Sequence, residues 1–316
     1  LTFATLNTVS CTLGLPSNII SINVEEPRNP TITTNPGTTV CAEDVTSLIY
    51  TVNTINTQPT DTYQWAINGV AVTIANGYAQ NETGTTYQVD TLGDIGDGDV
   101  VTVSVATAAP DSCTVTSTGV TMTVSAAPIA NLTSNATADT ICAGSAVVIT
   151  ADNVPGATYT FRLNGLAVPP GDVAGRVYTT SAITQQSTVT VQVSNAGGCS
   201  ATDTLTIFVP KVATAGTVSA SQADLVLCPG GNIANDILST NAGTLDANSS
   251  AGSVLTYQWQ QRNATTGNVW TNLAGATSNV LDISDTPLNI TEDTEIRRLT
   301  FATLNTVSCT LGLPSN

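Results

Sequence analysis

Residues 63–69 read Tyr-Gln-Trp-Ala-Ile-Asn-Gly, an aromatic-centred strand followed by a tight turn. Asn-Gly favours a type I′ hairpin turn, because both of its residues tolerate positive φ angles. The pattern returns as Tyr159-Thr160-Phe161 before Asn164-Gly165 and as Tyr257-Gln258-Trp259, each time between two cysteines. We therefore expect three domains of one kind, with cores filled by Trp65, Phe161 and Trp259.

On either side of these aromatics, β-branched residues alternate with Thr and Ser, as in strands that bury one face. The alternating runs are VTVSV at 101–105, VTMTV at 120–124, VTVQV at 189–193 and LTIFV at 205–209. No stretch shows helical spacing of apolar residues over three turns. The sequence therefore predicts an all-β protein of tandem immunoglobulin-like β-sandwich domains, in which each aromatic resembles the buried Trp of that fold.

An exact internal repeat sets the domain organisation. Residues 1–18 and 299–316 are identical, LTFATLNTVSCTLGLPSN, so the period is 298 residues. We interpret the chain as a window of a tandem array; the alternative is that the duplication reflects how the chain was delimited. Alternation stops at prolines, which predicts the end of a preceding third domain at 1–26 and immunoglobulin-like domains at 27–127, 128–210 and 211–316.

The third domain then lacks its last strand, which corresponds to residues 19–26. Short linkers that contain proline are expected to hold successive domains end to end as a semi-rigid rod, roughly 100–130 Å long for three domains.

Composition excludes several classes of function. The chain has 23 Asp and Glu, seven Lys and Arg and no His, for a formal net charge of −16. This charge disfavours nucleic acids and anionic membrane surfaces as partners, and no apolar run is long enough to insert into a membrane. Without an imidazole base, Ser-His-Asp and Cys-His mechanisms are excluded, so we predict no enzyme activity and no organic cofactor. No secretion signal is present, and we expect any such signal to lie outside this sequence.

Seven cysteines predict one disulfide per domain. Because Cys11 occupies the same repeat position as Cys309, its partner is expected in the preceding copy. Within the three domains the predicted pairs are Cys41 with Cys113, Cys142 with Cys199, and Cys228 with Cys309. Regular pairs indicate an oxidising, extracellular setting, whereas the paired CxxC spacings and histidines of zinc sites are missing. The cysteine positions suggest a staple between two end loops of each domain.

One further group is a candidate site. Asp94, Asp97 and Asp99 place three carboxylates in one glycine-containing turn, as a calcium site requires, although a solvated turn is the simpler interpretation. No other metal or cofactor is expected.

Several segments resemble a known class of repeats: CAGSAVVITA at 142–151, GGCSATDTLTIFV at 197–209, TYQWQQRNATTGNVWTNLAGATSNVLDI at 256–283 and TEIRRLTFATLNTVSC at 294–309. Together they are similar to the immunoglobulin-like or PKD-like repeats of giant Bacteroidota surface proteins, which include gliding-motility adhesins exported by type IX secretion. The resemblance covers essentially the whole chain. It implies a bacterial cell-surface location and O-glycosylation at Asp-Thr-aliphatic sequences, with Thr91 and Thr140 as candidates.

The leading functional hypothesis is a structural and adhesive segment of a long secreted surface protein, with adjacent copies and an unidentified surface or glycan as partners. A different hypothesis is an extracellular filament whose subunits exchange the strand Ile19–Val24. A third is a set of carbohydrate-binding spacer modules, which would need exposed aromatics such as Trp270.

Overall fold

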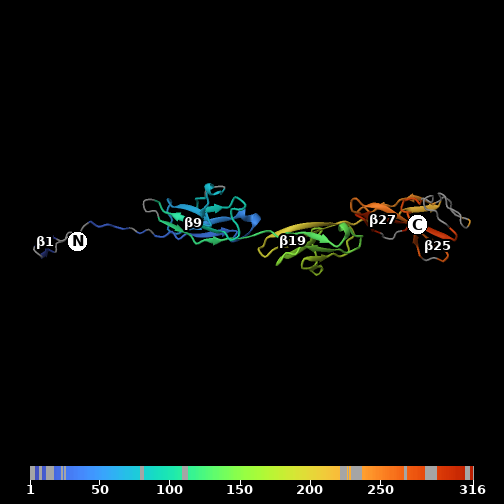
Figure 1. Cartoon of the computed structure of the whole chain (residues 1–316), viewed down its shortest axis with the longest axis horizontal. Coiled ribbons are helices and arrows are strands. Elements are labelled where there is room, and N and C mark those ends of the chain that lie inside the picture. The colour runs from blue at the N-terminus through green and yellow to red at the C-terminus, as the bar shows by residue number, and fades with distance from the viewer. Residues whose placement is uncertain are drawn as a thin grey trace. The chain divides into compact units, whose positions relative to one another are not determined.

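The computed structural model describes residues 4–6, 9–11, 18–22, 24, 26–78, 82–108, 113–220, 226, 228, 237–266, 269–281, 290–309 and 314–315. In this part of the chain the only helices are four short 3₁₀ segments, and strands make up the rest of the regular structure. The predicted all-β class of tandem immunoglobulin-like sandwiches is confirmed (Figure 1). None of the described helices is long and apolar enough to cross a membrane.

The chain divides into two compact units, residues 1–125 and 126–316. The first unit holds one sandwich. The second unit holds two sandwiches with separate cores, one on each side of Pro210. The unit boundary lies two residues before the predicted boundary at 127/128.

The first sandwich packs a three-stranded sheet against a five-stranded one. The three-stranded sheet has the order β3 (Thr31–Asn35), β5 (Ile49–Asn53), β8 (Thr86–Gln88). The other sheet runs β10 (Thr114–Thr116), β9 (Val100–Ala106), β6 (Thr62–Ile67), β7 (Val70–Ala71), with β11 (Val120–Thr121) also on β9. The last strand, β12 (Thr123–Ser125), pairs in parallel with β4 (Thr39–Cys41).

The second sandwich has two four-stranded sheets. One is β13 (Leu132–Ser134), β14 (Val148–Ala151), β18 (Val177–Thr179), β17 (Val173–Ala174). The other is β16 (Leu166–Ala167), β15 (Thr158–Leu163), β19 (Ser187–Ser194), β20 (Ser200–Ile207).

The third sandwich is built on β26 (Thr271–Asn272), β25 (Val254–Asn263), β27 (Thr294–Leu304) and β28 (Val307–Cys309). Opposite this sheet, β21 (Val212–Thr214) pairs with β24 (Thr244–Leu245), and β22 (Thr217–Ala220) pairs with β23 (Ile237–Asn241). Near the N-terminus, β1 (Ala4–Leu6) and β2 (Val9–Cys11) form a hairpin in the same register as the identical sequence in β27 and β28.

The predicted core aromatics are confirmed. Trp65 and Trp259 are fully buried and Phe161 is 2% exposed. The indole nitrogens of Trp65 and Trp259 each donate to a backbone oxygen nineteen residues later, Gly84 and Ser278. The alternating valines of β9 and β19 also lie in the cores, so strand periodicity located the buried faces correctly.

The Asn-Gly turns have the predicted geometry. Asn68 and Gly69 have φ angles of 51° and 80°, and Asn164 and Gly165 have 50° and 82°. Each asparagine also binds the strand that begins beside it: the Asn68 side-chain oxygen accepts from the Val100 amide at 3.0 Å. The turn residues therefore anchor a neighbouring strand as well as reversing the chain.

Candidate functional site at a domain junction

The first of the two cysteines in a sandwich lies at the end from which the chain continues into the next sandwich, which we call the exit end. Thr140 forms a parallel bridge with Phe208, just after β20, and the Ile141 amide donates to the Phe208 oxygen at 3.0 Å. Cys142 follows directly. Cys41 has the same position, because it ends β4, which runs parallel to the last strand β12.

The second cysteine lies at the opposite end, beside the turn that precedes the last strand. Cys199 comes immediately before β20, and Cys309 lies in β28, just after the turn from β27. The eight residues of β20 span roughly 26 Å at about 3.3 Å per residue, whereas disulfides join Cα atoms about 4.4–6.8 Å apart. Cys142 and Cys199 therefore cannot bond within one sandwich.

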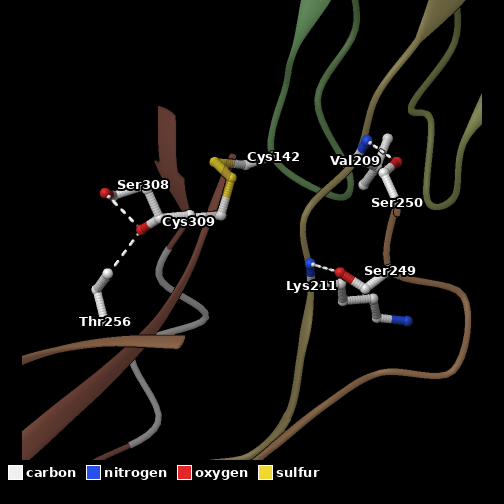
Figure 2. The surroundings of a disulfide bond; sticks show 9 residues. Cys142, Val209, Lys211, Ser249, Ser250, Thr256, Ser308 and Cys309 are labelled. Atoms are coloured by element: carbon white, nitrogen blue, oxygen red, sulfur yellow. Dashed lines mark hydrogen bonds between the residues drawn. A yellow bond between two sulfur atoms is a disulfide. The ribbon is translucent and has the colours of Figure 1, made fainter. Parts of the chain in front are cut away.

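A disulfide joins the second sandwich to the third instead. Cys142 is bonded to Cys309, 167 residues later, with the two Cα atoms 5.2 Å apart (Figure 2). The predicted pairs Cys142–Cys199 and Cys228–Cys309 are therefore wrong. Cys41–Cys113 is also wrong, because Cys41 takes part in a disulfide whereas Cys113 is free and exposed. Cys199 also takes part in a disulfide, and Cys228 is free and exposed. The Cys11 side chain lies outside the described part of the chain, so its predicted pairing is not addressed.

The linker between these two sandwiches is fixed to the third one by hydrogen bonds (Figure 2). The Val209 amide donates to the Ser250 hydroxyl at 2.7 Å, and the Lys211 amide donates to the Ser249 hydroxyl at 3.0 Å. The Lys211 ammonium lies 3.2 Å from the Asp246 carboxylate. The backbone amide of Asn248, and then Lys211, lower the pKa of Asp246 below its usual value.

A third set of contacts lies beside the disulfide. The side-chain amide of Asn305, in the turn between β27 and β28, donates to the Thr140 hydroxyl at 3.0 Å and to the Ala138 oxygen at 3.4 Å. Thr140 is only 3% exposed. Its prediction as a glycosylation site is therefore wrong, because its hydroxyl is used in the junction. Thr91 is exposed, and its glycosylation stays a prediction.

The candidate calcium turn uses its carboxylates internally. Asp99 accepts from the Gly96 amide at 2.6 Å and from the Asn68 side chain at 2.7 Å, and Asp97 accepts from the Val124 amide at 3.1 Å. Burial, and then the charge of Asp90, raise the pKa of Asp94. Among the described residues, no three His, Cys, Asp or Glu side chains are grouped so as to hold a metal ion. The turn is therefore organised as a hydrogen-bonded loop that feeds β9.

Arg298 is a structural residue that the sequence reasoning missed. It is fully buried in the third sandwich, where its guanidinium donates to the backbone oxygens of Ala215, Asn241 and Asn279 at 2.8–3.0 Å. The close approach requires glycine at 216, because a Cβ there would overlap the Asn241 oxygen and the guanidinium. The Arg-Arg pair was visible in the sequence only as part of a family resemblance.

The aromatic ring considered for sugar binding is covered by cations. The guanidinium carbons of Arg262 and Arg297 lie 4.6 and 4.2 Å from the centre of the Trp270 ring. Arg297 also donates to the Gln260 side chain at 2.8 Å, which holds it in place. Cation–π packing of this kind occupies a surface that stacking on a sugar would need.

No protein-family model matches the chain, and no curated protein sequence matches it. Several solved structures are similar in fold. Three N-terminal domains of the outer capsid protein Hoc of bacteriophage RB49 match with a TM-score of 0.35 and 13% identity, over 84% of this chain and 89% of that one. A Ca²⁺-stabilized adhesin of an Antarctic bacterium matches with a TM-score of 0.33 and 19% identity, over 89% and 72%. Titin domains I67–I69 match with a TM-score of 0.34 and 9% identity, over 90% of both chains. At these scores and identities the likenesses carry no argument about function.

Proposed function

We propose that this chain is a load-bearing structural segment of a long, secreted adhesive repeat protein on a bacterial cell surface. The observation that carries the proposal is the Cys142–Cys309 disulfide, which adds a second covalent connection between adjacent sandwiches. Disulfides persist in oxidising compartments, which supports an extracellular location.

The disulfide changes the path that tension follows. A force applied along the chain reaches Cys142 at the exit end of one sandwich and passes through the sulfur bridge to Cys309 at the near end of the next. Residues 143–308 then form a covalently closed loop that carries no load. Even if both sandwiches unfolded, this loop could not extend, so the junction is suited to a stalk or filament under tension.

The remaining features agree with a mechanical role. The linker hydrogen bonds and the Lys211–Asp246 ion pair also bind the linker to the third sandwich. The acidic composition and the lack of histidine are compatible with an extracellular segment without catalysis. Resemblance to gliding-motility adhesins suggests attachment or gliding as the setting, with an unidentified surface or glycan as the distal ligand.

Force spectroscopy of residues 126–316 tests the mechanical role. Unfolding both sandwiches with the disulfide intact should leave roughly 580 Å of chain unextended, at about 3.5 Å per residue over the sequence separation of 167 between the two cysteines. The C142S variant should release this length. Equal extensions for the two proteins would contradict the proposal, whereas C228S, which removes a free thiol, should behave like the parent protein.

A further inference from the structure

Two serines occupy equivalent positions in the first and third sandwiches. In the first sandwich the Ser117 amide donates to the Val103 oxygen at 2.9 Å, and the Ser117 hydroxyl accepts from the Val103 amide at 3.1 Å. Ser315 makes the same two bonds with Arg298, at the same two distances. Val103 and Arg298 lie opposite the core tryptophans Trp65 and Trp259 in their sheets, so the two serines are equivalent.

This equivalence identifies the residues that would follow. Five positions after Ser117 is Met122, which is 1% exposed in the core of the first sandwich. Ser315 repeats as Ser17, and five positions after Ser17 is Ile22. Ile22 is 84% exposed here, and Ile20 and Val24 on the same face are 80% and 87% exposed. Three alternating aliphatic side chains are thus exposed on one face of a segment that, by the repeat, corresponds to the strand around the buried Met122.

The spacing of the cysteines across the domain boundaries is nearly constant. The interval from the second cysteine of one domain to the first of the next is the same for Cys113 to Cys142 and for Cys199 to Cys228, and it is one position longer for Cys11 to Cys41. The intervals between the two cysteines within a domain, by contrast, all differ. The segment that joins two successive domains, from the second cysteine of one to the first cysteine of the next, therefore has a nearly fixed length. This is expected if disulfides connect neighbouring domains.

The N-terminal end of the first sandwich has an ion pair like the Lys211–Asp246 pair described above. Arg28 follows Pro27 and pairs with Asp61 at 2.9 Å, just as Lys211 follows Pro210 and pairs with Asp246. Both members of the Arg28–Asp61 pair are nearly buried. Cys113 lies at this same end, immediately before β10, and its thiol is free and exposed.

We propose that residues 19–24 of the next copy complete the third sandwich, and that Cys228 forms a disulfide with Cys113 of that copy. In the first sandwich the strand after Met122 pairs in parallel with β4, which ends in Cys41. The same pairing would bring the next copy's Val24 and its neighbours beside Val226 and Cys228, and Val226 is now 88% exposed. Cys228 would then lie at the exit end of its sandwich, facing the turn of the next domain.

The chemistry of the bond is thiol–disulfide exchange. The two thiols lose two electrons and two protons as the sulfur–sulfur bond forms, and a disulfide oxidant such as glutathione disulfide is reduced to two thiols. This inference rests on the proposed load-bearing role and extends it, because the sulfur bridge would continue the load path from one 298-residue repeat into the next.

Disulfide mapping of a tandem chain tests the inference. The chain consists of residues 1–316 followed directly by residues 19–125 of a second copy. Cys11 and the second copy's Cys41 are replaced by Ser, so that its Cys113 is the only added thiol. After oxidation in a glutathione buffer, free thiols are alkylated, and the denatured protein is cut with trypsin and Asp-N protease. Peptide 224–235 then carries Cys228, and the second copy's Cys113 peptide ends at 125.

We expect peptide 224–235 linked to the second copy's 111–125, with the first copy's Cys113 alkylated. Ile22→Asp in the second copy should leave both cysteines alkylated, whereas Ser21→Asp, on the opposite face of the strand, should not. An alkylated Cys228 in a sample whose Cys142 and Cys309 are linked would overturn the inference. That result would leave the mechanical role of the Cys142–Cys309 bond intact, so the two proposals can fail separately.

Discussion

Cys142 and Cys309 are bonded across a domain junction, 167 residues apart in sequence and 5.2 Å apart between Cα atoms. The parallel bridge between Thr140 and Phe208 places the first cysteine at the exit end of its sandwich. The hairpin of β27 and β28 places the second at the near end of the following one. The disulfide is therefore a consequence of strand topology, and its effect is on the connection between domains.

Removing this disulfide should loosen the junction without unfolding the sandwiches. In C142S we expect the amides of Ile141 and Lys211 to exchange at least about tenfold faster, a loss of about 1.4 kcal/mol of local protection. Amides in β19 should keep their protection, because each sandwich has its own core. Hydrogen exchange with mass spectrometry measures both. Unchanged exchange at Ile141 and Lys211 would mean that the hydrogen bonds alone hold the junction.

Acid should weaken the ion pair between Lys211 and Asp246. The pKa of Asp246 is lower in the folded protein than in the unfolded chain, where it is about 3.9. The ionised carboxylate therefore contributes fully to the stability of the fold at a pH above the unfolded pKa, and this contribution is lost as the pH falls through the folded pKa. We expect D246N to lower the melting temperature at pH 7 and to have less effect at pH 3. E43Q, which removes an exposed carboxylate, is the control. A D246N effect that is equal at both pH values would exclude this linkage.

The buried guanidinium of Arg298 should be essential to the third sandwich. Replacing it with Met removes the guanidinium that donates to the buried Ala215 oxygen and to the partly buried oxygens of Asn241 and Asn279, and loss of a buried hydrogen-bond partner costs about 1–3 kcal/mol. We expect R298M to lower the free energy of unfolding by about 3 kcal/mol in urea titrations, and R297M to cost less than about 1 kcal/mol. Equal losses would show that burial of Arg298 does not matter.

Removing the hydroxyl groups of two tyrosines in the first core should not destabilise the protein. Tyr50 and Tyr87 are buried and stacked, and among the described residues neither hydroxyl has a hydrogen-bond partner. Burial raises the pKa of both phenols, which keeps them neutral. Y50F and Y87F should be neutral or stabilising by up to about 1 kcal/mol. Y159F is the contrast, because Tyr159 binds the Val154 amide and the Asp152 oxygen, and it should be destabilising by about 1 kcal/mol.

Periodicity and turn chemistry were sufficient to predict most of the fold. The alternation at 101–105 identified buried valines, and Asn68-Gly69 identified a hairpin, because both signals are local. The disulfides depend instead on which ends of the sandwich two distant segments reach, and composition carries no information on that. The nearly constant interval between the cysteines of successive domains was the sequence signal that pointed to the junctions.

The surroundings of the candidate site residues could not be predicted from the sequence, for a related reason. Thr140 fitted a modification motif, but its hydroxyl is buried by Asn305 from another sandwich, a contact between segments far apart in the sequence. The Asp97 and Asp99 carboxylates accept hydrogen bonds from backbone amides of the same domain, which the sequence did not indicate, and calcium binding at this turn stays a prediction. Short motifs identify suitable side chains, whereas tertiary contacts decide whether those side chains are available.

The most direct test of the account is to map the disulfides of the chain without reduction. After free thiols are alkylated, trypsin and Asp-N protease place each of the seven cysteines on a separate peptide. We expect peptide 139–151, which carries Cys142, to be linked to peptide 299–316, which carries Cys309. A link from 139–151 to 177–202, which carries Cys199, would show a bridge within one sandwich and would contradict the junction disulfide on which the proposed function rests.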